Sequence, residues 1–382
     1  MAKTESKHYI IVAGEDSGDL HASHLISAIK DLCPKSTFSG VGGKKMQKAG
    51  VALIYNLAKL AVVGFVEIIK NYSQIKNIFN SILKEILEQK PTAVILVDYP
   101  GFNLRLAKAI KQQNKDIKIF YYISPQIWAW KKNRVYHIKK YIDHMLVLFS
   151  FEEELYKKYN IPVTFVGHPL MDEVKTTCTK NNFLNQNKLK NDNKTITIGL
   201  LPGSRRKEVE TILPIMFKAL KEIKANTQAI LIKAPSISKD LFKKIALDTK
   251  YTPNLITNHS YDAINACDIC LVASGTATLE VAILGKPMLI IYKTSFLTWI
   301  LAKLLIKIPY IGLVNIVSQK LIAPEFIQYQ ANPDAIRNAL LEIINNKSRM
   351  EKMKTDLKVI PDVLGSAGAS LNAAEVIVKE SN

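Results

Sequence analysis

ITIGLLPGSRRKEV, residues 196–209, joins an apolar run, a Pro-Gly-Ser turn and two arginines at the expected start of a helix. Such a turn directs unpaired backbone N–H groups and the positive end of the helix dipole at one point. Arg205 or Arg206 would add a planar set of donors for phosphate oxygens. The stretch therefore predicts a strand–turn–helix unit that binds a diphosphate at Gly203 and Ser204. An ordinary helix cap followed by surface arginines is the alternative.

Similar apolar runs, separated by helical patterns, recur on both sides of this stretch and predict an α/β fold with parallel sheets. A polar stretch rich in Asn and Lys, 176–194, interrupts the alternation and reads as a linker. We expect two doubly wound, Rossmann-like domains, 1–175 and 195–355, and a C-terminal helical tail, 356–382. The expected strands are 9–14, 93–98, 119–124, 144–149 and 163–168, then 196–201, 229–234, 268–273 and 287–292.

Length and charge agree with two domains and an anionic partner. The chain has 382 residues, of which 48% are hydrophobic, and this exceeds the size at which single cores usually divide. Its 52 Lys and Arg against 33 Asp and Glu give a formal charge of +19, which favours nucleic acid, nucleotide phosphates or an acidic membrane surface. Because the lysines are scattered, we do not expect a nucleic-acid patch.

The first ten residues, MAKTESKHYI, pass from a polar tail into an apolar run and do not resemble a secretory signal, so we expect a cytoplasmic protein. The four cysteines fit a reducing compartment. Cys267 and Cys270 have a metal-like spacing, but no second pair accompanies them and only His259 lies close before them, which favours ordinary packing in a strand.

Two apolar segments leave membrane contact and core packing as open alternatives. Residues 294–317 include Phe296, Trp299, Ile300 and Leu304 beside lysines, a composition typical of a helix that lies on an anionic membrane rather than crossing it. Residues 61–69, AVVGFVEII, could take up acyl chains. A buried core helix is the rival interpretation of each segment.

A second phosphate-binding pattern occupies 269–287, ICLVASGTATLEVAILGKP. Ser274, Gly275 and Thr276 form the predicted turn after a strand, where they offer N–H and hydroxyl donors to phosphate. Glu280, one turn into the helix, could accept hydrogen bonds from both hydroxyls of a ribose. Favourable interaction with the helix dipole is the alternative role of Glu280.

Distinctive residues also follow strands of the first half, where parallel sheets bind their ligands. They are AGEDSGD at 13–19, Asp98-Tyr-Pro-Gly, and SPQIWAW at 124–130. Trp128 and Trp130, followed by a basic run, could stack on bases in a nucleic-acid protein. Alternatively they anchor the packing, and the basic run faces solvent or a substrate phosphate.

Seven motifs, in order along nearly the whole chain, resemble those of the lipid-A-disaccharide synthase family. The resemblance implies a GT-B glycosyltransferase, in which an acceptor-binding N-terminal domain faces a UDP-sugar-binding C-terminal domain across a cleft. In that fold C-terminal helices often return to the first domain. The motifs are AGEDSGD (13–19), VDYPGFNLRLA (97–107), YYISPQIWAW (121–130), VGHPL (166–170), LLPGSRRKEV (200–209), ASGTATLE (273–280) and APEFIQ (323–328).

The resemblance also implies the reaction, in which UDP-2,3-diacylglucosamine and 2,3-diacylglucosamine 1-phosphate (lipid X) give a β-1,6-linked disaccharide 1-phosphate and UDP. Inversion at the anomeric carbon requires a base, for which we expect Asp98 with Glu15 in reserve, and charge stabilisation of the diphosphate, for which we expect Arg205. A cap for the helix after Pro100-Gly101 is the alternative role of Asp98. Arg206 falls where the family varies. No Asp-x-Asp occurs in the chain, so we expect no metal and no cofactor.

Asn315 matches a family asparagine near the active site, although Val314 stands where the family has proline. The family's Gly-Arg reads Gln319-Lys320, which keeps a cation but loses bidentate geometry. We therefore expect the loop that contains Asn315 and Gln319 to contact substrate.

The expected partners are the two acylated substrates and the anionic cytoplasmic face of the inner membrane, with no nucleic acid and with a homodimer left open. The competing functions are another UDP-sugar GT-B enzyme, a UDP-sugar 2-epimerase, and a non-catalytic protein that binds anionic lipid or RNA.

Overall fold

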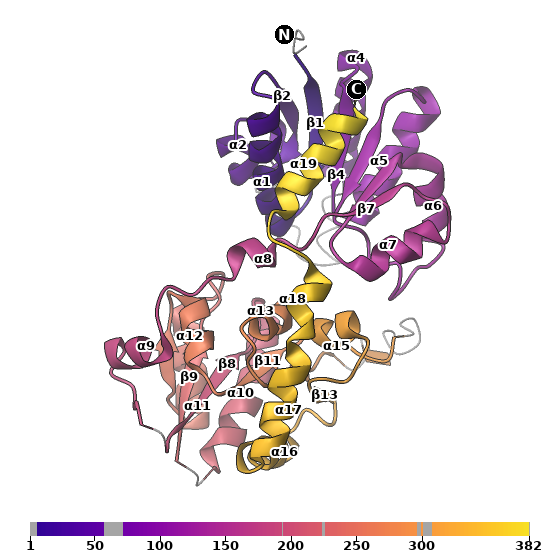
Figure 1. Ribbon diagram of the computed structural model, residues 1–382. Helices are drawn as coiled ribbons and strands as arrows, with labels where there is room; N and C mark the ends of the chain where they lie inside the picture. Colours follow the sequence, from indigo (N-terminus) through magenta and orange to yellow (C-terminus); the bar gives the residue numbers. More distant parts are fainter. Residues whose placement is uncertain are drawn as a thin grey trace. The chain divides into compact units, whose positions relative to one another are not determined.

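Two units divide the chain in the computed structural model, which describes residues 6–56, 72–192, 194–223, 226–295, 299–300 and 308–381 (Figure 1). Unit 1 comprises residues 1–169 together with 364–382, and unit 2 comprises 170–363. The sequence placed the first boundary at 175 and the start of the tail at 356. In the structure the segment between 356 and 363 stays with unit 2, and only the last residues join unit 1.

Unit 1 is built on a seven-stranded sheet in the order β3-β2-β1-β4-β5-β6-β7, and every pairing is parallel. All five expected runs contain strands. Those of β1, β4, β5 and β6 are apolar and mostly buried, as expected for central strands of a parallel sheet, whereas β7 lies at the edge and is only half-buried. β2 and β3 were not expected. The strands are β1 (His8–Ala13), β2 (Thr37–Gly42), β3 (Ala52–Asn56), β4 (Ala93–Val97), β5 (Ile119–Tyr122), β6 (His144–Val147) and β7 (Val163–Phe165).

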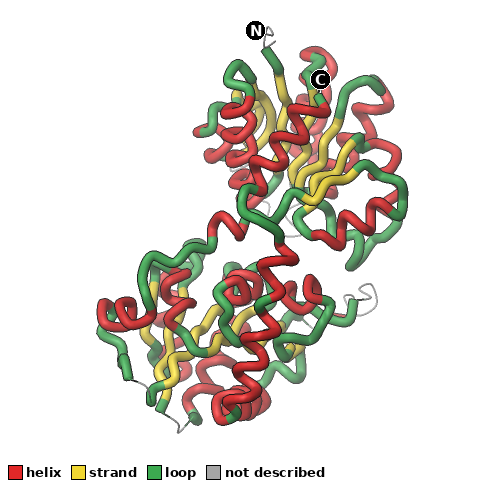
Figure 2. Tube along the Cα trace, in the orientation of Figure 1, coloured by secondary structure: helices red, strands yellow, loops and turns green. Residues whose placement is uncertain are grey.

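Helices lie on the sheet of unit 1 and enclose its core (Figure 2). The C-terminal helix belongs to this layer, since α19 packs against α1. Ile377 of α19 and Leu25, Ile26 and Ile29 of α1 are fully buried. The helices are α1 (Asp16–Leu32), α2 (Lys44–Lys48), α4 (Tyr72–Gln89), α5 (Pro100–Gln113), α6 (Arg134–Tyr141), α7 (Ser150–Lys157) and α19 (Ala369–Glu380).

Unit 2 contains a six-stranded parallel sheet in the order β10-β9-β8-β11-β12-β13. The four expected strands occupy its centre, whereas the two edge strands, β10 and β13, were not expected. The strands are β8 (Ile196–Leu201), β9 (Thr227–Ile232), β10 (Asn254–Ile256), β11 (Ile269–Ala273), β12 (Met288–Tyr292) and β13 (Glu325–Ile327).

The polar stretch 176–194, read from composition as a linker, lies inside unit 2 and contains helix α9. This helix packs against α12, and buried Phe183 and Leu184 provide its apolar face. The helices of unit 2 are α8 (Leu170–Glu173), α9 (Lys180–Gln186), α10 (Arg206–Lys221), α11 (Lys239–Thr249), α12 (Ser260–Ala266), α13 (Ala277–Ile283), α15 (Leu313–Ser318), α16 (Pro333–Asn345), α17 (Lys347–Leu357) and α18 (Val359–Leu364).

Each sheet has one point where the strand order reverses direction. In unit 1 it lies between β1 and β4, and in unit 2 between β8 and β11. Loops at the carboxyl ends of such a strand pair diverge to opposite faces of the sheet and leave a crevice in which doubly wound proteins bind ligands. The two topological switch points therefore identify the loops that follow β1, β4, β8 and β11 as candidate ligand-binding loops.

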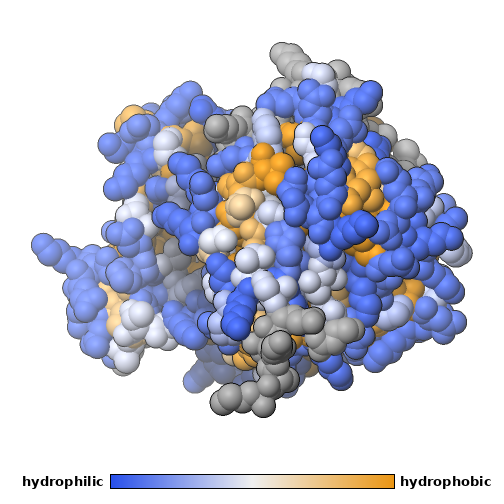
Figure 3. Space-filling model, turned by 90° about the horizontal axis from the view of Figure 1, so that it is seen from above, coloured by the Kyte–Doolittle hydropathy of each residue, from blue (hydrophilic) through white to orange (hydrophobic). Residues whose placement is uncertain are grey.

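The charged side chains lie mostly at the surface. The face drawn in Figure 3 is largely hydrophilic, with hydrophobic residues in smaller groups. Among the described residues no lysine or arginine is buried, whereas the carboxylates of Asp19, Glu152 and Asp262 are. In this part of the chain no helix combines the length and apolar character needed to cross a bilayer.

Candidate active site

Asp98 directly follows β4 at the switch point of unit 1, in a turn that the structure holds tightly. Asp98 and Tyr99 both adopt left-handed backbone conformations, with φ of 47° and 48°. Nδ2 of Asn103 donates to the carbonyl oxygens of Val97, at 3.2 Å, and Asp98, at 2.7 Å, while the Tyr121 hydroxyl donates to the Asp98 carbonyl at 2.6 Å. Two consecutive non-glycine residues with positive φ are uncommon and strained, and such strain is concentrated at functional sites.

The environment of Asp98 raises its pKa to about 6, first through burial and second through the negative charge of Glu15, while the backbone N–H of Tyr99 opposes the shift. Glu15 is exposed in the loop between β1 and α1. The two carboxylates thus come from the two strands that flank the switch point. A carboxylate with a pKa near 6 is ionised at neutral pH and basic enough to accept a proton from a reacting hydroxyl.

Gly14 allows these two loops to approach each other. A Cβ atom at position 14 would lie 2.2 Å from the ring of Tyr99. In the same AGEDSGD motif Asp19 is buried, and its carboxylate accepts the backbone N–H groups of Gly43, Lys45 and Met46 at 2.7, 3.0 and 3.0 Å. Asp19 therefore holds the start of α2, whereas the Glu15 side chain is exposed.

The SPQIWAW loop after β5 is fixed to α7 by a buried carboxylate. Nε1 of Trp128 donates to Oε1 of Glu152 at 3.1 Å, and Ser124 Oγ lies 2.7 Å from the Tyr156 hydroxyl. Burial raises the pKa of Glu152 to about 8. Trp128 is thus a packing anchor, while Trp130, 37% exposed, lies at the surface with the basic run.

His168 of the VGHPL motif is also buried, and its backbone N–H donates to the Leu364 carbonyl at 2.9 Å. Burial, followed by the repulsion of His21, lowers its pKa to about 4. At neutral pH this histidine is therefore uncharged, and the motif connects the end of β7 to the returning C-terminal segment.

In unit 2 the turn after β8 is hydrogen-bonded to Glu208 in the first turn of the following helix. Gly203 has φ of +111°, and a Cβ there would lie 2.6 Å from Oε2 of Glu208. That oxygen accepts the backbone N–H groups of Ser204 and Arg205, each at 3.3 Å, and Oε1 accepts from the Arg205 guanidinium at 3.0 Å. The long N–H bonds leave the start of α10 able to exchange this carboxylate for a ligand's phosphate.

Two arginines stand at this turn with nearly equal exposure. The side chains of Arg205 and Arg206 are 76% and 77% exposed. Arg205 pairs with Glu208, which contacts the turn itself, whereas Arg206 pairs at 2.7 Å with Glu210, farther along α10. Of the two guanidiniums, Arg205 is thus held beside the N–H groups of the loop.

The turn after β11 offers its middle residues to a ligand. Oγ of Ser274 donates to the Ile311 carbonyl at 3.0 Å and is engaged in the fold. Gly275 has no heavy atom within 4 Å of its Cβ position, and Thr276 is exposed. Burial, followed by the charge of Glu173, raises the pKa of Glu280 to about 7. There is space beside Gly275, and the Thr276 side chain is exposed to solvent. Glu280 follows them in the first turn of α13.

Asn315 was expected to contact substrate, but its amide is occupied within the protein. Nδ2 donates to the Ala323 carbonyl at 2.7 Å and to Glu325 at 2.8 Å, while Oδ1 accepts the N–H groups of Ile322 and Ala323, both at 2.9 Å. The residue is fully buried. It therefore positions the loop, while Gln319, exposed at the end of α15 with φ of 55°, is accessible.

Glu325, in the APEFIQ motif, completes this anchor. Its carboxylate accepts the N–H of Ile311 at 2.9 Å and that of Gly312 at 2.8 Å, in addition to the amide of Asn315. The sequence drew attention to the motif without giving Glu325 a role. Nothing in the local sequence indicated that Glu325, which directly follows Ala323-Pro324, accepts the N–H groups just before a helix that begins 12 residues upstream.

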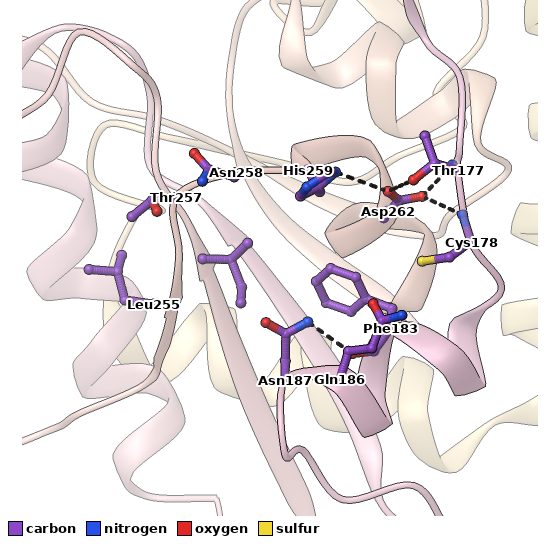
Figure 4. Close-up of a pocket in the computed structure, with 11 residues that line it drawn as sticks. Thr177, Cys178, Phe183, Gln186, Asn187, Leu255, Thr257, Asn258, His259 and Asp262 are labelled. Atoms are coloured by element: carbon purple, nitrogen blue, oxygen red, sulfur yellow. Dashed lines mark hydrogen bonds and ion pairs between the residues drawn. The ribbon is translucent and has the colours of Figure 1, made fainter.

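A separate cavity of about 480 Å³ lies in unit 2 beside β10, α9 and α12 (Figure 4). The carboxylate of Asp262 accepts the N–H and hydroxyl of Thr177, both at 2.7 Å, and the N–H of Cys178 at 3.1 Å, while His259 lies 3.7 Å away. These bonds fasten residues 177–178 to α12. None of the residues predicted to bind substrate lines this cavity.

The Cys267 and Cys270 pair packs against β8. Both side chains are buried, and a Cβ at Gly199 would lie 2.9 and 2.8 Å from their sulfur atoms. Hydrogen bonding to Cys270, and then burial, raise the pKa of Cys267 well above its usual value, so its thiol stays protonated. The pair fills space behind a glycine, as expected for strand packing.

The sequences of known proteins agree with the motif order. The family model for Lipid-A-disaccharide synthetase matches residues 9–377. A lipid-A-disaccharide synthase from Syntrophus aciditrophicus is 41% identical over 384 aligned residues, which cover 99% of each chain. The chain belongs to the lipid-A-disaccharide synthase family. It is therefore a glycosyltransferase, and the expected two-domain α/β fold is confirmed.

Solved structures place this family member in a fold used for more than one chemistry. A calicheamicin glycosyltransferase aligns with a TM-score of 0.61 at 12% identity, covering 98% of this chain and 99% of the other. The UDP-GlcNAc 2-epimerase of Neisseria meningitidis, bound to UDP-GlcNAc, aligns with a TM-score of 0.55 at 15% identity, covering 97% and 98%. At these identities the likeness shows the fold alone, so function must be argued from the site.

Some residues noted in the sequence lie outside the described part of this family member. They include the segment 61–69 and, within 294–317, Phe296 and Leu304. Trp299 is described, and its ring meets that of Tyr329 edge-on, with centroids 5.6 Å apart.

Proposed function

We propose that the chain transfers 2,3-diacylglucosamine from UDP to the 6-hydroxyl of lipid X, giving the β-1,6-linked disaccharide 1-phosphate and UDP. Membership of the lipid-A-disaccharide synthase family supports the substrates. The observation that carries the mechanism is Asp98, a strained and largely buried carboxylate at the switch point of unit 1, with a pKa raised to about 6.

In the proposed step Asp98 accepts the proton of the acceptor hydroxyl. The hydroxyl oxygen then forms a bond to the anomeric carbon from the face opposite UDP. At the same time the bond from that carbon to the diphosphate oxygen breaks, its electron pair leaves with UDP, and the α-linked donor gives a β-linked product. The proton ends on the Asp98 carboxylate, and the negative charge ends on the diphosphate.

Unit 2 supplies the groups that stabilise this charge. Arg205, with the N–H groups of the loop formed by Gly203 and Ser204, would replace their present partner Glu208 with diphosphate oxygens. Gly275 and Thr276, beside Ser274, offer a second set of donors after β11. Glu280 would accept the ribose hydroxyls from its position one turn into α13.

The remaining loop contributes by positioning and contact. Asn315 fixes the segment around α15 through its four internal hydrogen bonds, and exposed Gln319 at the end of that helix would contact the donor sugar. Because Gln319 and Lys320 replace a Gly-Arg pair, the contact is made without a bidentate guanidinium.

We propose that the enzyme acts at a membrane surface. Both substrates carry acyl chains, so an enzyme that uses them works at a membrane surface, and the formal charge of +19 favours a surface of anionic lipid. We place the enzyme at the cytoplasmic face of the inner membrane as a peripheral protein.

The same fold also serves a UDP-GlcNAc 2-epimerase, so epimerisation is the competing activity that an experiment must separate. An epimerase alters the sugar of its nucleotide substrate without an acylated acceptor. Incubation of the donor alone separates the two functions, because the transferase leaves UDP-2,3-diacylglucosamine unchanged until lipid X is added.

The test is turnover of UDP-2,3-diacylglucosamine with lipid X in detergent and EDTA, followed by mass spectrometry of the disaccharide. We expect product from the wild-type chain and a loss of at least about 100-fold in Asp98→Asn, which keeps the side-chain volume but removes the base. Glu15→Gln is the matched control and should retain most of the activity. Absence of product from folded wild type would contradict the transferase, and full activity of Asp98→Asn would move the base to Glu15.

A further inference from the structure

The basic run after β5 includes two cations that share one aromatic ring. Nζ of Lys131 lies 4.4 Å from the centroid of a Trp130 ring, and the guanidinium carbon of Arg134 lies 5.2 Å from it. Lys131 has a left-handed backbone conformation with φ of 53°, and Arg134 is the first residue of α6. The ring thus holds both cations near one another, and a negative charge beside them would be favourable.

Within the described residues that charge is not supplied by the protein. Neither Lys131 nor Arg134 forms an ion pair with a carboxylate in this part of the chain, whereas other lysines of unit 1 do, such as Lys111 with Asp143 at 2.7 Å and Lys157 with Glu153 at 3.0 Å. Arg134 is only partly exposed, and burial lowers its pKa. A partly desolvated guanidinium without a carboxylate is a receptor for an external anion.

The cluster and the proposed base follow two neighbouring parallel strands, β5 and β4. The charge of Arg134 acts on the Tyr121 side chain, which is fully buried at the end of β5. The hydroxyl of Tyr121 donates to the Asp98 carbonyl at 2.6 Å. Tyr121 thus feels the charge of Arg134 and also contacts the turn that carries the base.

We propose that Arg134 and Lys131, held by Trp130, bind a phosphate monoester, namely that of the acceptor substrate. The inference rests on the proposed function, in which the acceptor carries one phosphate and presents its hydroxyl to Asp98. A phosphate at this cluster orients the acceptor sugar with respect to the base. Arg134 makes the bidentate contact, and Lys131 contributes a point charge.

A membrane headgroup offers related phosphate chemistry, so the experiment must separate the two sources. The variants are Arg134→Gln and Lys131→Gln. The matched control is Lys132→Gln, which removes the same charge from an exposed neighbour that makes no ring contact among the described residues. Thermal melts verify that all three fold.

Steady-state kinetics give the first readout. We expect Arg134→Gln to raise the KM for lipid X by about 10- to 100-fold and Lys131→Gln by about 3- to 10-fold, while kcat and the KM for UDP-2,3-diacylglucosamine stay within about twofold of wild type. With 2,3-diacylglucosamine lacking the phosphate, wild type and Arg134→Gln should have the same KM. The proposal would be overturned if the KM for lipid X in Arg134→Gln were unchanged, or if it rose no more than in Lys132→Gln.

Two binding measurements complete the test. Calorimetry with glucosamine 1-phosphate should give a signal for wild type that Arg134→Gln lowers by about tenfold. Sedimentation with phosphatidylglycerol vesicles should be equal for Arg134→Gln and Lys132→Gln, and a selective loss of vesicle binding by Arg134→Gln would assign the cluster to lipid headgroups instead. If wild type binds the sugar phosphate through Arg134 but forms no disaccharide, the proposed function fails and the phosphate site stands.

Discussion

The buried carboxylates of this protein have structural roles that the Asp98 carboxylate does not share. Asp19, Glu152 and Asp262 are buried and accept hydrogen bonds that hold a loop or helix start. The charge of Glu15 contributes to the raised pKa of Asp98, and the side chains of Asn103 and Tyr121 hold the turn through the Asp98 carbonyl oxygen. Because the bonds that hold this turn are made to backbone carbonyl oxygens, the Asp98 carboxylate is available for proton transfer.

This arrangement predicts the pH dependence of activity. With its pKa raised to about 6, Asp98 is ionised above that pH and loses its basic form below it. We expect kcat/KM to fall about tenfold per pH unit below about pH 6. Glu15→Gln removes the repulsion that contributes to the raised pKa, so the acid limb should move to lower pH. The measurement is kcat/KM between about pH 5 and pH 8 for both proteins.

The same variant series discriminates between the two acids. If Glu15→Gln abolishes activity throughout this range while Asp98→Asn retains an acid limb, Glu15 is the base. Because the pKa of Asp98 is raised in the folded state, its ionisation above about pH 6 costs stability. Asp98→Asn should therefore be at least as stable as wild type at pH 8, and a lower melting temperature there would indicate a structural role for the carboxylate.

Arg205 and Arg206 form a natural control pair. Their side chains are equally exposed and each pairs with one glutamate, so simple loss of surface charge should affect both alike. We expect Arg205→Ala to lower kcat/KM for the donor by about 100-fold, because it removes charge stabilisation from the leaving diphosphate. Arg206→Ala should change it by less than about twofold, since an exposed ion pair contributes little. Equal effects in donor kinetics would exclude a specific role for Arg205.

At the scale of elements, the sequence predicted most strands from their apolar runs and missed β2, β3, β10 and β13. β2 contains two glycines, which read as loop residues. Gly40 is required inside the strand, because a Cβ there would lie 1.9 Å from the Ile11 carbonyl oxygen. The edge strands β10 and β13 are three residues long and only half-buried. Short edge strands carry too few apolar residues for periodicity to reveal them.

The candidate site shows the same division. Motif order and the carboxyl ends of strands located Asp98, Arg205 and Glu280, because their positions follow from the alternation of strands and helices. Local sequence could not reveal that Asn315 is consumed by internal hydrogen bonds or that Glu325 caps the same loop. These partnerships depend on where β13 pairs, and that strand was itself not predicted.

The anchor at α15 predicts a large effect on stability from one buried side chain. Asn315→Ala would leave the N–H groups of Ile322 and Ala323 without their acceptor and remove the amide from Glu325. We expect a loss of about 2–4 kcal/mol in the free energy of unfolding of unit 2. Gln319→Ala, at an exposed site in the same loop, should change it by less than about 0.5 kcal/mol. Urea unfolding followed by circular dichroism measures both, and equal stabilities would refute the anchor.

At the scale of the whole molecule, the two units differ in how the chain builds them. Unit 2 is continuous from 170 to 363, whereas unit 1 needs both ends of the chain. Hydrogen bonds between described residues fasten the returning segment along its length, including one from Lys118 to the Glu380 carbonyl. Lys7 donates to the Val378 carbonyl at 3.1 Å, Asn372 to the Val166 carbonyl at 3.0 Å, and the His168 N–H to the Leu364 carbonyl at 2.9 Å.

This discontinuity predicts opposite behaviour of two fragments. Residues 170–363 should fold alone and melt cooperatively, because every strand of their sheet is present. Residues 1–169 alone should aggregate or unfold, since loss of α19 exposes the buried face of α1. Circular dichroism and light scattering distinguish these outcomes. Fusion of residues 364–382 to the fragment 1–169 should restore the fold of that fragment.

A single substitution tests the contribution of α19 to unit 1 in the intact chain. Ile377 is fully buried in α19, so Ile377→Ala should destabilise unit 1 by about 2–4 kcal/mol, whereas Glu375→Ala on the exposed face should cost less than about 0.5 kcal/mol. Hydrogen exchange resolves the units, and protection should fall in β1, β4 and α1 while unit 2 keeps its rates. Because Asp98 and Arg134 lie in unit 1, the same variant should lose acceptor turnover on warming before unit 2 loses its affinity for UDP. Simultaneous loss of both would show that the units unfold as one and that the C-terminal helix stabilises more than unit 1.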